Sequence, residues 1–244
     1  MNLSLTHGQT EDACFAYSTF GMALLARHGD IGTAFEFSEL ALNLNDKLAG
    51  RRLKGRLLVA HALAFSPWKA PFARSTSILD DAFAASIEVG DLLHANFAAM
   101  FYCWPMLQQG LPLDAVLATA RRQGAFALAN HNVPVYNAIR FQQQLAIRLM
   151  DPTHASASLN IDDFNEVACL CALEATNFGF GIQMAYTTQQ IAEFLYGNYA
   201  SALTAAQRAA VKSYQGTGLI MLDSMHHFYF ALTMTALYSH ACDD

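Results

Sequence analysis

Nine histidines and five cysteines supply the side chains that most often ligate zinc or act as a base or nucleophile. Their spacing forms no metal-binding pattern. There is no His-Glu-x-x-His, and the adjacent His226 and His227 would point to two different faces of a helix. The cysteines are an odd set without a Cys-x-x-Cys pair: Cys14, Cys103, Cys169, Cys171 and Cys242. We therefore expect no metal site and no disulfide framework, as is typical of a reducing cytoplasm.

Acidic pairs offer a second kind of chemistry, the binding of magnesium. Three such pairs occur, Asp80-Asp81, Asp162-Asp163 and Asp243-Asp244. None has the further carboxylates of a magnesium-binding prenyl-transfer motif, so we expect solvated helix ends or caps. The chain has no glycine-rich phosphate loop and no Gly-x-Ser-x-Gly elbow, and Asp163-Phe164-Asn165 has no His-Arg-Asp before it. We expect neither catalysis nor a cofactor.

Aromatic side chains with polar neighbours are the remaining candidates for a binding surface. In a stack of helical hairpins the first helix of each pair usually lines the concave face. The candidate groove for a partner segment or small ligand comprises His61, Trp68, Tyr102, Trp104, Tyr136, Arg140, Gln143, His226 and Tyr229. Tyr136 and Arg140 lie one helical turn apart and are the expected anchors. The alternative is that these side chains are buried between helices.

Charge and hydropathy exclude several other classes of function. The 244 residues carry 14 basic and 20 acidic side chains, a formal net charge of −6, and 54 % are hydrophobic while 14 % are charged. Such a chain is neither disordered nor a nucleic-acid binder driven by bulk charge. The basic residues from Lys47 to Arg56 fit a solvated corner better than a phosphate site. No apolar stretch reaches the roughly 20 residues that span a bilayer, and the start lacks a secretory signal, so we expect a cytoplasmic protein without membrane contact.

The elements that position these residues are predicted to be helices. Small and apolar residues recur at steps of three and four between Ala34 and Leu48, and again between Leu113 and Ala127. Strand-like alternation is hard to find. We predict an all-α fold with helices over residues 11–28, 33–48, 53–65, 71–89, 91–109, 112–130, 134–150, 161–173, 176–196, 199–214 and 221–241.

Three turns share a pattern in which a glycine stands five residues before an alanine of the next helix. The glycines are Gly29, Gly110 and Gly197, which are 81 and 87 residues apart, and the alanines are Ala34, Ala115 and Ala202. Glycine adopts the left-handed conformation that ends a helix, and alanine lets the next helix pack closely. Helix breakers near the middle of each interval are Pro67, Pro71 and Asp151-Pro152. We predict antiparallel helical hairpins of about 40 residues stacked in series, longer than a standard tetratricopeptide repeat; a closed bundle is the alternative.

Two places should depart from this regularity. Pro105 falls inside a predicted helix, where it removes a backbone donor and should kink or split the helix. Residues 151–160 form the best candidate for a long loop. The hairpins together should form one helical-repeat domain over residues 1–244, a right-handed α-α superhelix.

Five short stretches, in a fixed order, carry a resemblance to a known family. They are 34–42 after the Gly29-Asp30 turn, Trp68-Lys69, 88–91, 195–203 and 226–232. From about residue 12 to residue 238 the chain resembles the helical, tetratricopeptide-like region of large bacterial multi-sensor signalling kinases. In that family the region follows a serine/threonine-kinase-like domain and an AAA/STAND-type ATPase domain, and it precedes GAF and histidine-kinase modules. The chain departs from the family pattern at Ser66-Pro67, at Pro105 and near Pro152, and it contains no kinase or ATPase motif.

The resemblance implies a segment of a larger signalling protein or a stand-alone relative of that segment. We therefore expect a non-catalytic helical-repeat module that binds protein domains, within its own chain or another, and relays state between ATPase and sensor-kinase modules. A homo-oligomer is compatible with this role, whereas nucleic acid and membrane are not expected partners. The second hypothesis is a sensor whose groove encloses a small molecule, and the third is an all-α enzyme with a carboxylate or histidine in a central cavity.

Overall fold

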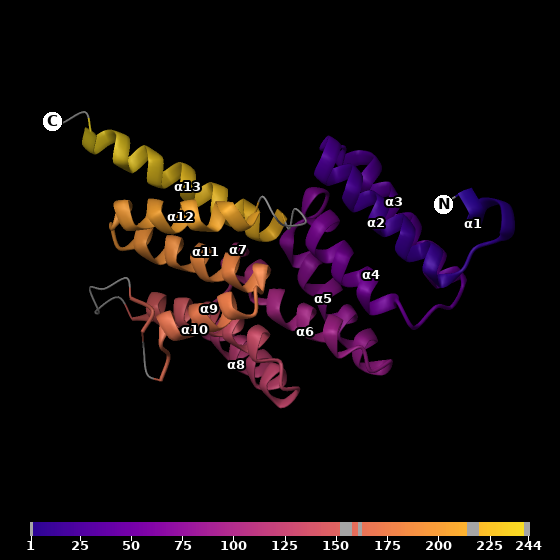
Figure 1. Ribbon diagram of the computed structural model, residues 1–244, viewed down its shortest axis with the longest axis horizontal. Helices are drawn as coiled ribbons and strands as arrows, with labels where there is room; N and C mark the ends of the chain where they lie inside the picture. Colours follow the sequence, from indigo (N-terminus) through magenta and orange to yellow (C-terminus); the bar gives the residue numbers. More distant parts are fainter. Residues whose placement is uncertain (1, 152–157, 161–162, 214–219, 242–244) are drawn as a thin grey trace. The chain divides into compact units, whose positions relative to one another are not determined.

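Figure 1 shows the computed structural model, which describes residues 2–151, 158–160, 163–213 and 220–241. All regular elements among these residues are helical, so the all-α prediction is confirmed. In chain order they are α1 (Asn2–His7), α2 (Glu11–His28), α3 (Ile31–Lys47), α4 (Lys54–Ala60), the π-helical turn η1 (His61–Phe65), the 3₁₀ turn η2 (Ser66–Trp68), α5 (Phe72–Glu88), α6 (Leu92–Phe101), α7 (Cys103–Gln108), α8 (Leu113–Ala129), α9 (Val133–Met150), α10 (Glu166–Ala175), α11 (Gly179–Leu195), α12 (Tyr199–Ser213) and α13 (Ile220–Ala241).

The helices pack in neighbouring pairs, as expected for stacked hairpins. α2 packs on α3, α4 on α5, α8 on α9 and α11 on α12, and the last pair runs side by side in orange in Figure 1. Short turns make consecutive helices antiparallel neighbours. The chain divides into two compact units, one holding α1 to α7 and the other α8 to α12 with nearly all of α13. A stack of hairpins also divides into compact stretches, so the single repeat domain over residues 1–244 stays a prediction.

Most predicted helix boundaries are confirmed to within a few residues. The helix expected over 161–173 differs, because α10 begins at Glu166, after the N-cap Asn165, whose Oδ1 accepts a hydrogen bond from the Ala168 backbone N–H. The short helix α1 was not predicted. Most of the predicted loop over 151–160 lies outside the described residues, as do Cys242 and the pair Asp243-Asp244.

Two prolines shape the helices of the first unit. Pro105 has no N–H to donate to the carbonyl of Phe101, where α6 ends, so the predicted 91–109 helix is split into α6 and α7. At η1 the Ser66 N–H bonds the His61 carbonyl, one residue further back than in an α-helix. In the same pattern the next hydrogen bond would run from the N–H of residue 67 to the Ala62 carbonyl, but Pro67 has no N–H. The Ala62 carbonyl instead accepts the Ser75 hydroxyl from α5, at 3.1 Å.

The turns between helices repeat one hydrogen-bonding device. At the ends of α5, α8 and α11, the residues Gly90, His131 and Gly197 have positive φ, and paired backbone bonds close a Schellman motif. Gly29 ends α2 with the simpler bond from its N–H to the Leu25 carbonyl. All three predicted glycines, Gly110 included, have positive φ and stand between two helices, as expected.

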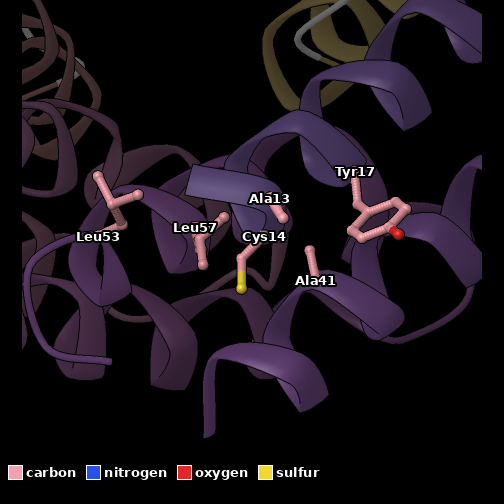
Figure 2. Close-up of a cluster of buried hydrophobic side chains, with 6 residues drawn as sticks. All are labelled: Ala13, Cys14, Tyr17, Ala41, Leu53 and Leu57. Carbon is pink, nitrogen blue, oxygen red and sulfur yellow. The ribbon is translucent and has the colours of Figure 1, made fainter. Parts of the chain in front are cut away.

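Small side chains let the helices of the first unit approach closely. Figure 2 shows Ala13, Cys14 and Tyr17 of α2 beside Ala41 of α3, with Leu53 and Leu57 at the start of α4. At Gly21 an added Cβ would lie 2.8 Å from the Ala34 carbonyl oxygen, so α2 and α3 touch there through their backbones. Ala34 is fully buried, as predicted from its place after the Gly29 turn.

A seam of alanines joins α11 and α12 in the second unit. The buried members on α12 are Ala202, Ala205, Ala206 and Ala209. Ala202 therefore has the close-packing role predicted for it. For Ala115 that prediction is wrong, because this side chain is exposed and α8 buries Val116 and Ala120 instead.

Candidate functional site

The nine residues of the predicted groove fall into two groups, one in each unit. His61, Trp68, Tyr102 and Trp104 belong to the first unit, and Tyr136, Arg140, Gln143, His226 and Tyr229 belong to the second. His61, Trp104 and His226 are buried, so they offer no exposed contact in this conformation, whereas Trp68 is exposed. The other five are partly exposed. A single groove formed by all nine residues stays a prediction.

His61 lies in η1 and bridges two adjacent residues of α3. Its Nδ1 is 2.9 Å from Ser38 Oγ and its Nε2 is 3.4 Å from Glu39 Oε1. Burial lowers the pKa of His61 to about 4, with a further contribution from the positive charge of Arg74. The Glu39 carboxylate is too hydrated to offset this effect, because its side chain is 46 % exposed. The neutral ring therefore carries its proton on Nε2, facing Glu39, and accepts the Ser38 hydroxyl at Nδ1.

Serine, histidine and carboxylate within hydrogen-bond reach are the components of a nucleophilic site. Here, however, Ser38 is 1 % exposed and lies in the middle of α3, where its neighbours' backbone N–H groups are used in the helix. A substrate cannot reach its Oγ, and a helix interior offers no free N–H pair for an oxyanion. The arrangement joins α3 to η1 by polar contacts, next to the rings of Phe35 and Phe65.

The remaining aromatic residues of the first unit serve three different purposes. Trp104 is completely buried in α7. Tyr102 is partly buried, and its hydroxyl donates a 2.8 Å hydrogen bond to Asp80 Oδ2 on α5. Trp68, at the end of η2, is 43 % exposed and is thus the candidate of this group most available to a partner.

Arg140 is the centre of a polar cluster on the face of α9, and its predicted role with Tyr136 as an anchor for a partner or ligand stays a prediction. Its guanidinium donates to the Tyr136 hydroxyl at 2.9 Å and to Asp163 Oδ1 at 2.8 Å, and it lies 5.2 Å from the centre of the Phe164 ring. Although burial alone would lower it, these hydrogen bonds raise the pKa of Arg140, and the same contact lowers the pKa of Asp163. The Arg140 side chain is only 11 % exposed. Its charge is therefore used mainly to hold Asp163 against α9, and little of it faces solvent.

His226 is paired with Gln190 across α11 and α13. Gln190 Nε2 donates to the His226 carbonyl at 2.9 Å, and Gln190 Oε1 lies 2.9 Å from His226 Nδ1. Burial lowers the pKa of His226, and His227 adds to this effect. Tyr229, one turn further along α13, packs edge-on against Phe194. Both residues thus connect helices, while Gln143 is partly exposed on α9.

A pocket that sequence reasoning did not find opens on the second unit, over the α11–α12 hairpin. Its volume is about 240 Å³, and it is lined by Glu166, Gln189, Glu193, Ser201, Thr204, Ala205 and Arg208. The signal was present as polar residues at helical spacing on both sides of the Gly197 turn: Gln189 and Glu193 before it, and Ser201, Thr204 and Arg208 after it. Only the packing of α10 beside α11 adds Glu166 to the same wall.

The two carboxylates of this pocket are held differently. Glu166 uses both oxygens, since Oε1 accepts the Gln189 amide at 2.6 Å and Oε2 accepts the Leu159 N–H at 3.4 Å. Glu193 accepts the Asn198 side chain at 2.8 Å through Oε2. Arg208 lies over the ring of Tyr186, with 5.7 Å from guanidinium carbon to ring centre. The pocket therefore presents charges of both signs.

Two further kinds of feature are a metal-binding cluster and a membrane-spanning helix. Within the described residues, no group of three or more His, Cys, Asp or Glu side chains is placed to hold a metal ion. None of the helices in the same part of the chain has the length and apolar character needed to cross a membrane.

Neither a protein-family model nor a curated protein matches the sequence. The residues, their packing and the resemblance to the helical region of signalling kinases are therefore what bears on the function of this chain.

Proposed function

We propose that this chain is a non-catalytic helical-repeat interaction module that relays conformational state between ATPase and sensor-kinase modules of a bacterial signalling protein. The resemblance motivates this proposal, and the packing of neighbouring helices in pairs supports it. Such an architecture suits the role, because a rigid stack of hairpins loses little entropy when a partner domain docks on it.

The observation that carries the proposal is an exposed apolar patch at the turn between α5 and α6. Its members are Ile87, Val89, Leu92 and Leu93, which flank Gly90. Leu93 is the most open of them, with 56 % of its surface exposed. Large aliphatic side chains gathered on one turn are a frequent sign of a protein contact. Completing the burial of such half-exposed side chains is worth about 1 kcal/mol each.

A partner for this patch is expected to be an apolar surface of a neighbouring domain. A site-specific cross-link tests this in cells that produce the protein. A photo-reactive benzophenone amino acid at Leu93 should form an adduct with a polypeptide that carries an ATPase or sensor-kinase module, or with such a module of the same chain. Leu92→Lys beside the probe should lower the yield at least fivefold, because a lysine would have to be buried in the contact.

The matched control places the same probe at Ser77, an exposed polar position on α5. Equal yields at Leu93 and Ser77, or no adduct at Leu93, would contradict the proposal. If the only adduct formed is with a second copy of the chain, the patch serves self-assembly and the proposed relay function is wrong.

The sensor hypothesis has its own supporting observation, which is the charged pocket over the α11–α12 hairpin. This pocket is lined by none of the nine residues predicted for a groove. A ligand there would be a separate property of the module.

A further inference from the structure

The pocket over the α11–α12 hairpin combines a cation with acceptors that are not fully used. Arg208 is on α12 and contacts Tyr186 through the face of its ring and through a side-chain hydrogen bond, and none of the ion pairs of the described residues includes it. A guanidinium has five N–H donors, so the contact with Tyr186 leaves several of them for a ligand. Arg208 can therefore still bind a carboxylate, and with the bidentate geometry that arginine favours.

On the α11 wall, the hydrogen bonds of Glu166 and Asn198 determine what remains for a ligand. Because Gln189 Nε2 donates to Glu166, the other atom of that amide, Oε1, is an acceptor. Because Asn198 occupies Oε2 of Glu193, its Oε1 remains available to accept a donor. Gln189 and Glu193 are one turn apart, about 6 Å along the helix axis. Of these two acceptors the Glu193 carboxylate is the charged one, and it suits an ammonium group, which has three donors.

The two kinds of group come from opposite walls of the same pocket. Arg208 lies seven residues, about 10 Å along the axis, beyond Ser201 on α12. In antiparallel helices this sets it beside Gln189 rather than beside Glu193, which is close to the Gly197 turn. A ligand that spans the pocket thus meets a cation near one end and a carboxylate near the other.

The charges of both signs in the pocket favour a ligand that also carries both. A plain anion would meet two carboxylates, and a plain cation would meet Arg208, so each would leave one charge of the pocket unfavourably placed. The volume of about 240 Å³ is below the usual size of pockets for drug-sized ligands, about 300–1,000 Å³, and it suits a molecule the size of an amino acid.

We propose that this pocket binds a small zwitterion, an amino acid or short amino-carboxylate, with its carboxylate on Arg208 and its ammonium on Glu193. Ser201 and Thr204 line the remaining wall, where a hydroxyl can adapt as donor or acceptor. The ligand would give the module an input separate from the apolar patch at the α5–α6 turn, which belongs to the other unit.

Isothermal titration with the full chain tests this proposal directly. The probes are the twenty standard amino acids and a ladder of ω-amino acids, namely β-alanine, 4-aminobutyrate and 6-aminohexanoate, which measures the preferred separation of the two charges. At least one probe should bind with one-to-one stoichiometry. Its N-acetyl and carboxamide derivatives should each bind at least tenfold more weakly, because each has lost one of the two charges.

Two variants locate the site. Glu193→Gln and Arg208→Gln should each weaken binding at least tenfold while their thermal midpoints stay close to that of the parent chain. The matched controls remove the same charges elsewhere. They are Glu36→Gln, at an exposed position of α3, and Arg122→Gln, at an exposed position of α8. Both variants should bind the ligand within twofold of the parent chain.

Three results would overturn the proposal. They are the absence of binding by every probe at 10 mM, equal binding by the capped derivatives, and binding that neither Glu193→Gln nor Arg208→Gln weakens. None of them bears on the cross-link at Leu93, so this proposal and the proposed function fail independently.

Discussion

At the scale of single residues, the polar side chains that look reactive mostly connect helices. His61 joins η1 to α3 through Ser38 and Glu39, and His226 joins α13 to α11 through Gln190. Both rings are buried and have lowered pKa values. A buried histidine that must stay neutral makes a fold sensitive to acid.

The stability of the chain should therefore fall between pH 6.5 and pH 4. The pKa of His61 is about 4 in the folded chain and 6.5 as the reference for the unfolded chain, so the unfolded state binds the proton first. Above pH 6.5 both states are neutral and nothing is lost. At pH 4 the loss from this residue reaches about 3 kcal/mol. Urea unfolding at pH 7, 6, 5 and 4 measures it.

Two substitutions separate His61 from other acid-sensitive groups. His61→Gln keeps an acceptor for Ser38 but cannot take up a proton, so its unfolding free energy should fall less steeply with acid. His28→Gln, which replaces an exposed histidine at the end of α2, should keep the steep fall. If His61→Gln and the parent chain show the same slope, the acid sensitivity arises elsewhere.

At the scale of elements, close approach and capping decide where each helix lies. Glycine is required at Gly21, where a Cβ would meet the Ala34 carbonyl, and at Gly55, where it would meet Ser86 on α5. These positions set the spacing of α2 against α3 and of α4 against α5. Side-chain caps then set where the following helices begin.

The substitution Gly21→Ala should destabilise the chain by about 1–3 kcal/mol, because the new methyl group must push two backbones apart. This overcomes the gain of up to about 1 kcal/mol that alanine has in a helix. Gly32→Ala on α3 is the matched control, since its Cβ would meet nothing closer than Asp30 Oδ1 at 3.7 Å. It should leave the urea midpoint unchanged or raise it, and a lower midpoint for both variants would point to a cause other than the α2–α3 contact.

The N-cap of α6 offers a second test at this scale. Asp91 accepts the His94 N–H at 3.2 Å and also contacts the His94 ring at 2.7 Å. Asp91→Ala should cost about 1 kcal/mol of unfolding free energy, whereas Asp91→Asn should keep most of it, because asparagine caps nearly as well. Equal losses for both would mean that the charge, and not the cap, is what matters.

At the scale of the whole molecule, two surfaces with different chemistry belong to different units. The apolar patch at the α5–α6 turn suits a protein domain, and the charged pocket over α11 and α12 suits a small zwitterion. An interaction module with a ligand input needs both kinds of surface. Measurements of each unit within the intact chain can tell whether the two surfaces act together.

Hydrogen exchange on the full chain gives this measurement. A zwitterion from the titration panel, at 100 times its dissociation constant, should stabilise the state that binds it by about 2.7 kcal/mol. Amides of α11 and α12 should then exchange more slowly, while those of α2 and α3 should not change. The Arg208→Gln variant should show no slowing anywhere. Uniform slowing over the chain would show instead that both units respond to the ligand.

Local interactions let the sequence by itself determine the helices. Gly29 and Gly197 end helices because positive φ costs glycine little, and Pro105 splits one because it lacks an N–H. These effects act within about five residues, so composition and periodicity were sufficient to predict them. The close packing of Ala34 and Ala202 followed from the same turns, although that of Ala115 did not.

Only the tertiary structure decided which of the chemically capable residues meet and which of them face solvent. His61 and Ser38 are 23 residues apart, and Trp104 gives no sign in the sequence that it is completely buried. Glu166 and Arg208 line one pocket only because α10 packs on α11 and α11 packs on α12. Helical periodicity gives the face of a helix but not its neighbour, since many pairings bury similar apolar area. The choice among them depends on close contacts such as that of Gly21 with Ala34, which exist only once the helices are packed.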